Sequence, residues 1–228
     1  MGSPQENERR ARLEAAEARG MEMFGAIEAA GFVRPGRKES EIERDIFALA
    51  RDRFGVEKHW HKRIVRAGPN SVTVFHDNPP DRTVEAEDTV YLDLGPVFED
   101  WEADIGRTYA LGRDPEKLRL VADLEKTFVR VQEHFHRTPE ITGAELYAFA
   151  VRAANEAGWT FGGAGAGHII GEFAHLTIPG DKDANRINPK NMSRMRDPDT
   201  LGRAKHWILE IHLVDRGRAF GGFYERLM

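Results

Sequence analysis

Apolar side chains recur every three or four residues in four stretches of the chain, a period typical of amphipathic helices. The pattern predicts helices over residues 7–31, 40–55, 115–136 and 142–157. The second is expected to begin with Ser40 as its N-cap. The last has Thr142 at its start and Glu145 three residues later, which together predict a capping box.

Shorter apolar segments rich in β-branched and aromatic residues predict strands. These segments cover residues 64–65, 71–75, 89–94, 104–111, 207–214 and 220–227. Segments 89–94 and 104–111 are expected to pair as a hairpin, which would place Asp93 and Asp104 on one face of a sheet. Residues 179–205 are polar and predict a long loop. With no fixed repeat and no linker, the pattern favours one α+β domain over residues 1–228.

Composition narrows the functional classes. The 228 residues carry a formal net charge of −5, which argues against a strongly basic nucleic-acid-binding protein. The chain has no cysteine, so disulfides, thiolate metal sites and a cysteine nucleophile are excluded. No stretch approaches the roughly 20 apolar residues that span a bilayer, and the N-terminus has no apolar signal segment. We therefore expect a cytoplasmic protein without a nucleic-acid or membrane partner.

Five residues that can bind metal stand in apolar surroundings where charge is costly. They are Asp93, Asp104, His168, Glu210 and Glu225. Burying an ionised carboxylate costs several kcal/mol unless it is paired or bound to a metal. The sequence offers no matching set of buried Arg or Lys residues, so divalent cations are the expected counter-charges.

The order of these residues resembles the creatinase/aminopeptidase P/methionine aminopeptidase family, the pita-bread metallopeptidases. Five short segments carry the resemblance in addition to the two closing glutamates. They are Val33–Gly36 with Glu41, Ala67–Ser71 with His76, Leu92–Gly95, Asp104–Thr108, and Gly167–Gly171 with His175. The resemblance implies a curved antiparallel sheet flanked by helices, without the separate N-terminal domain of some relatives.

The resemblance also implies a ligand set for two divalent ions. Asp104 and Glu225 would bridge the ions, Asp93 would complete one site, and His168 with Glu210 would complete the other. Oxygen donors with one imidazole suit Mn²⁺ best, and Co²⁺, Fe²⁺ or Zn²⁺ remain possible. A water held between two cations becomes the nucleophile, and Glu210 would accept its proton.

Three further histidines are candidates for contact with the substrate. By resemblance, His76 and His175 would contact the substrate carbonyl or the tetrahedral intermediate. His212 lies two residues after Glu210 and shares its strand face; it either contacts the substrate or is an exposed strand-end residue. The pairs His59–His61 and His134–His136 are interpreted as surface residues.

The predicted activity is cleavage of an amide or peptide bond, as in an aminopeptidase or a Xaa-Pro peptidase, with a peptide or small amide as substrate. A homodimer is possible. Two alternatives stay open: a metal-independent, creatinase-like hydrolase of a small amide or amidine, and a non-catalytic binding protein on the same scaffold.

Overall fold

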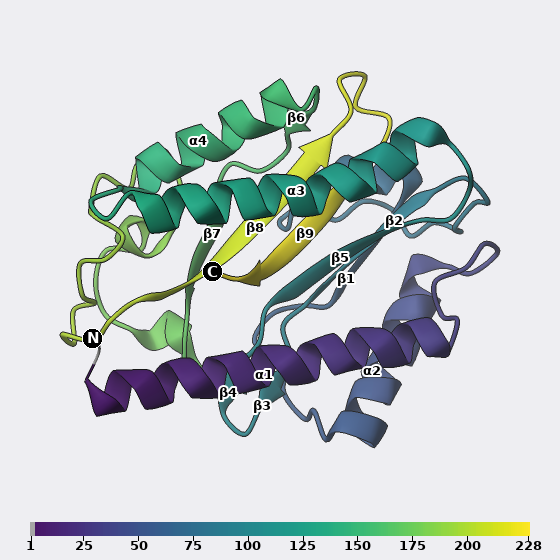
Figure 1. Ribbon diagram of the computed structural model, residues 1–228. Coiled ribbons are helices and arrows are strands. Elements are labelled where there is room, and N and C mark those ends of the chain that lie inside the picture. The colour runs from purple at the N-terminus through teal and green to yellow at the C-terminus, as the bar shows by residue number, and fades with distance from the viewer. Residues whose placement is uncertain (1–2) are drawn as a thin grey trace.

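The computed structural model describes residues 3–228, and its centre is one antiparallel sheet (Figure 1). Strand order is β1-β2-β5-β9-β8-β6, and β7 also pairs with β8. The strands are β1 Ile64–Ala67, β2 Thr89–Leu94, β5 Ile105–Ala110, β6 Thr160–Phe161, β7 Gly167–Ile170, β8 His206–Val214 and β9 Gly221–Leu227. A small ribbon of β3 Val97–Phe98 and β4 Trp101–Glu102 closes the connection between β2 and β5.

Four long helices pack in two pairs along the sheet (Figure 1). They are α1 Pro4–Ala29, α2 Glu39–Phe54, α3 Pro115–Arg137 and α4 Gly143–Glu156. One apolar core joins α1 and α2 to β1, β2 and β5, and a second joins α3 and α4 to β8. Three short 3₁₀ turns complete the described elements: Gly68–Val72, His175–Thr177 and Asp183–Asn185.

Both cores lie on the same face of the sheet. On β2, Leu92 enters the first core, and on β8, Leu209 enters the second. Because side chains alternate across a strand, their neighbours Asp93 and Glu210 point to the opposite face. The two main cores therefore lie on one face and the predicted ligands on the other, where α1 also reaches through Leu13, which packs against Ile208 and Leu227.

Most predicted elements are confirmed. The four helices form, and Thr142 with Glu145 makes the expected capping box on α4. The hairpin also forms, since β2 pairs with β5 from Thr89↔Ala110 to Leu94↔Ile105. Within residues 3–228, no helix is both long and apolar enough to cross a membrane.

The predicted strand over residues 71–75 is wrong. Gly68–Val72 forms a 3₁₀ turn, and the Thr73 hydroxyl donates to the Asn70 carbonyl at 2.7 Å. Side-chain hydrogen bonds of this kind compete with strand pairing. The predicted helix start at Ser40 is also wrong. Lys38 is the N-cap of α2, and the Ser40 hydroxyl bonds instead to Asp81 at 2.8 Å.

A prediction concerns Gly106, which lies in β5 at the point where that strand meets β9. An added Cβ would lie 2.6 Å from Phe223 Cδ1 and 2.9 Å from Glu225 Cβ. We expect Gly106→Ala to lower the free energy of unfolding by roughly 1–3 kcal/mol, because neighbouring side chains must move. Urea denaturation measures this change.

Gly25→Ala is the matched control. Gly25 is exposed in α1, and no atom lies within 4 Å of its added Cβ. Removing a helical glycine there should raise the free energy of unfolding by up to about 1 kcal/mol. Equal stability of Gly106→Ala and the native chain would contradict the close packing at β5 and β9.

Candidate metal centre

The register of the sheet sets three of the predicted ligands in one row across four strands. Asp93 of β2 pairs with Gly106 of β5, Gly106 pairs with Glu225 of β9, and Glu225 pairs with Glu210 of β8. Asp104 precedes Gly106 by two residues and therefore lies on the same face. Four carboxylates from distant parts of the sequence thus meet at one place.

His168 reaches this row from β7. Its Nε2 lies 3.0 Å from Asp104 Oδ2 and 3.7 Å from Glu210 Oε1. Its Nδ1 lies 2.7 Å from the Ile169 carbonyl, which can only accept a hydrogen bond. Nδ1 therefore carries a proton, and Nε2 is the atom directed at the carboxylates.

A sixth residue, His61, lies in the same cluster. Its Nε2 is 3.1 Å from Asp104 Oδ1 and 3.4 Å from Asp93 Oδ1, and its side chain is 5% exposed. The interpretation of His59 and His61 as surface residues is therefore wrong; both ring nitrogens of His59 are buried too. One signal was available: His61 shortly precedes β1, whose Ile64 pairs with Asp93.

Two groups of potential metal ligands result, and Asp104 belongs to both. One group is His61, Asp93 and Asp104, and the other is Asp104, His168 and Glu225. Within each group the ligand atoms lie within 4.8 Å of one another. Glu210 borders the second group through its contact with His168.

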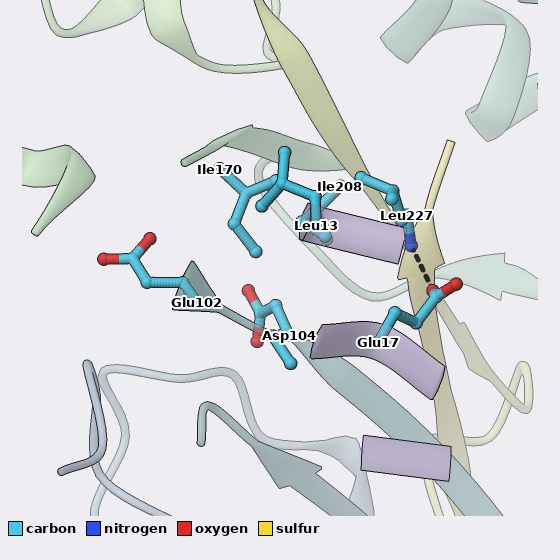
Figure 2. Close-up of a pocket in the computed structure, with 8 residues that line it drawn as sticks. Leu13, Glu17, Glu102, Asp104, Ile170, Ile208 and Leu227 are labelled. Carbon is cyan, nitrogen blue, oxygen red and sulfur yellow. Dashed lines mark hydrogen bonds between the residues drawn. The ribbon is translucent and has the colours of Figure 1, made fainter. Parts of the chain in front are cut away.

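Apolar side chains close the site on the α1 side of Asp104 (Figure 2). Leu13 of α1 packs with Ile170, Ile208 and Leu227 in a small core beside the carboxylates. A backbone N–H of the same region, that of Leu227, donates to Glu17 at 2.8 Å and fixes α1 against β9 (Figure 2). Asp104 is 2% exposed, so its charge has little contact with water.

Burial acts on the carboxyls of the row. It raises the pKa of Asp93 to about 7, with Asp104 and Glu210 adding repulsion and the two imidazoles opposing it. Burial also raises the pKa of Glu210, and raises that of Glu225 well above its ordinary value. In the metal-free protein these groups therefore hold protons that a carboxylate in water would release.

Asp104 behaves in the opposite way. Burial alone would raise its pKa, but hydrogen bonds from His168 and His61 outweigh burial and lower the pKa to about 2. Burial likewise opposes protonation of the two imidazoles. The neighbouring carboxylates prevail and raise the pKa of His61 and of His168 to about 9.

One buried carboxylate oxygen of the site has no hydrogen-bond partner within residues 3–228. Among the described residues, Glu225 Oε2 is buried without a hydrogen-bond partner, although its side chain belongs to a ligand group. Carboxylate oxygens with imidazole nitrogens are donors that divalent transition metals accept. The residues present therefore fit divalent cations.

His175 lies beside the cluster. Its ring stacks on that of His168 with a centroid distance of 5.2 Å. Glu102 accepts from the backbone N–H of His175 at 3.0 Å, and its other oxygen lies 2.5 Å from Nδ1. Glu102, which no sequence pattern singled out, is buried in β4.

The other two predicted histidines lie outside the ligand groups. His76 is exposed, and its ring contacts that of Phe75, which in turn contacts His61. His212 is buried, and its Nε2 donates to the Ser71 carbonyl at 2.9 Å. The expectation of an exposed strand-end His212 is thus wrong, and its contact with substrate stays a prediction.

The metal-free protein should show a wide spread of histidine titrations. We expect the rings of His61 and His168 to titrate at about pH 9, because carboxylates surround them. His212 should titrate at about pH 4, because burial disfavours its charged form. Nitrogen-15 NMR of the imidazoles in chelator-treated protein measures all three.

The same shifts predict how stability depends on pH. A raised imidazole pKa stabilises the folded state fully below the unfolded value of about 6.5. This contribution is lost as the pH rises through about 9. The free energy of unfolding of metal-free protein should therefore fall between pH 7 and pH 9; a constant value over that range contradicts the pairing.

Comparisons with known proteins agree with this geometry. The sequence profile described as Metallopeptidase family M24 matches residues 11–199. The Xaa-Pro dipeptidase of Lactobacillus delbrueckii subsp. lactis is 28% identical over 127 residues, which are 56% of this chain and 34% of that protein. The Xaa-Pro dipeptidase of Pyrococcus horikoshii is 28% identical over 148 residues, 63% of this chain and 40% of that protein. The chain thus spans about two fifths or less of these curated relatives.

Solved structures share the fold over nearly the whole chain. The X-Pro aminopeptidase of Thermotoga maritima superposes with a TM-score of 0.72 and 23% identity, covering 98% of this chain and 58% of that one. The methionine aminopeptidase of Rickettsia prowazekii gives a TM-score of 0.70 and 14% identity, covering 97% of this chain and 92% of that one. The predicted α+β, pita-bread fold is confirmed. With its profile match over most of the described residues, the chain belongs to Metallopeptidase family M24.

Proposed function

We propose that this protein is a dinuclear metal-dependent hydrolase that cleaves an amide or peptide bond, as an aminopeptidase or a Xaa-Pro peptidase does. The observation that carries the proposal is the position of Asp104, which belongs to two buried ligand groups at once. A carboxylate shared in this way is suited to bridge two cations. The Xaa-Pro dipeptidases among the relatives support a peptide as substrate.

Five residues would hold the ions: Asp93, Asp104, His168, Glu210 and Glu225. When bound, the two cations supply Lewis acidity toward the substrate carbonyl and make water acidic enough to act near neutral pH. We expect Mn²⁺ to be preferred among the metals that this set accepts, with Co²⁺, Fe²⁺ or Zn²⁺ as possible substitutes. A cytoplasmic location and a homodimer stay predictions.

Glu210 is suited to move the proton in the reaction. Its side chain is 28% exposed, whereas those of Asp93 and Asp104 are 10% and 2% exposed. Glu210 is therefore more open to water and substrate than either aspartate. Burial raises its pKa in the metal-free protein, whereas bound cations would favour the ionised form that a general base requires.

His175 is suited to hold the substrate carbonyl. Glu102 fixes its Nδ1 and backbone N–H, so the ring keeps its orientation beside His168 and leaves Nε2 for a substrate. A donor held rigidly near the reacting carbonyl can stabilise charge as it develops. His76 is exposed next to Phe75 and would act from the rim of the site. His212 would act from its place on β8, two residues after Glu210 and opposite Phe223.

Metal counting and turnover test the proposal together. Elemental analysis of the purified, metal-supplemented protein should give two divalent ions per chain. Asp104→Asn should retain fewer than one, since it removes the shared carboxylate. Glu210→Gln should lower kcat toward Xaa-Pro dipeptides by about 10²–10⁴, the usual contribution of a general base.

Asp52→Asn is the matched control, because Asp52 is an exposed carboxylate on α2. It should keep both ions and full activity. Turnover of small amides by metal-free protein would instead support the creatinase-like alternative. No turnover of any peptide or amide with Mn²⁺ present would support the binding-protein alternative.

A further inference from the structure

We propose that His61 is a ligand of the ion beside Asp93, so that each of the two ions is bound by one imidazole. The inference rests on the proposed dinuclear function and adds a ligand from outside the five residues assigned above. His61 lies in the segment before β1, outside the row of carboxylates that the sheet register defines.

His61 and His168 have matching hydrogen bonds. Each ring directs Nδ1 at the carbonyl of the next residue: that of Lys62 at 2.6 Å and that of Ile169 at 2.7 Å. Each ring directs Nε2 at Asp104, His61 toward Oδ1 and His168 toward Oδ2. A histidine that binds a metal usually donates its other N–H to a carbonyl or carboxylate, which orients the ring. His61 meets this condition as well as His168 does.

The segment around His61 is fixed by contacts that do not involve the carboxylates. The Trp60 backbone N–H donates to the Gly95 carbonyl at 2.9 Å, and the indole N–H donates to the Ala103 carbonyl at 3.2 Å. The Trp60 ring packs edge-on against His61 with a centroid distance of 4.3 Å. The imidazole is therefore held in place before any ion binds, as a ligand site requires.

Gly95 leaves the room that the ring of His61 occupies. A Cβ on Gly95 would lie 2.5 Å from His61 Nε2 and 2.5 Å from the Trp60 indole nitrogen. Any larger residue there would push His61 away from Asp93. The position of Nε2 thus depends on a glycine that directly follows β2, the strand that carries Asp93.

Charge balance favours a ligand over a permanent ion pair. Asp104 and the three carboxylates of the row carry four negative charges when ionised, and two imidazolium rings would offset only two of them. Two divalent cations offset all four and leave both imidazoles neutral, with Nε2 free to coordinate. A second nitrogen donor also suits Zn²⁺ and Co²⁺ better than a site with one imidazole does.

Zinc titration of chelator-treated protein tests the assignment. The native chain should bind two Zn²⁺ ions, counted by elemental analysis and followed by competition with a chromophoric chelator. His61→Ala should keep one ion and bind the second at least about tenfold more weakly. Gly95→Ala keeps every proposed ligand and should give the same loss, because its methyl group displaces the ring of His61.

His136→Ala is the matched control, since His136 is an exposed histidine on α3 and should leave both affinities unchanged. Nitrogen-15 NMR of the zinc-loaded native chain gives a readout independent of any variant: His61 should keep its proton on Nδ1 and carry none on Nε2. A protonated Nε2 in the loaded protein, or two ions bound at native affinity by His61→Ala, overturns the assignment but leaves the proposed function standing. A native chain that binds no zinc and no Mn²⁺ overturns both.

Discussion

Repulsion among four carboxylates on one sheet face is the constraint on which this structure depends. The register Asp93–Gly106–Glu225–Glu210 brings the charges together, and the apolar contacts beside Asp104 limit the access of water. Such charges are tolerated only when protons, imidazolium rings or metal ions reduce them. In the metal-free protein the first two do so, since the pKa of Asp93 rises and those of the histidines rise with it.

The packing of the helices stabilises the sheet against the repulsion among the carboxylates. Both main helix cores lie on the same face, where Leu92 of β2 and Leu209 of β8 are buried and stabilise the sheet independently of the carboxylate row. Packing on one face thus fixes the register, and the register fixes the distances on the other face. A register shift of one residue in any of these strands would point its metal-binding side chain toward the apolar core. Burying a charge there would be strongly unfavourable.

The helices and the long strands could be predicted because their periodicity and caps are local properties of the sequence. The five ligand candidates could be found because charge is conspicuous in an apolar strand. His61 was missed, because beyond its place shortly before β1 its position depends on contacts between Trp60 and two distant carbonyls and on the space left at Gly95. The prediction of a strand at residues 71–75 was wrong because the Thr73 hydroxyl donates a hydrogen bond to the nearby Asn70 carbonyl. The segment therefore forms a 3₁₀ turn instead of pairing with another strand.

The place of β1 in the sheet explains how a residue outside the row can reach it. β1 is an edge strand, paired on one side by β2, so the segment before it has no further strand to continue toward. That segment turns over the open face, where His59 forms a bridge with Pro96 and Trp60 bonds to Gly95. The inner strands β5, β9 and β8 have partners on both sides and can contribute only the side chains that their register allows. The additional nitrogen ligand proposed on the Asp93 side comes from this segment, and the contacts of Trp60 hold His61 in place there.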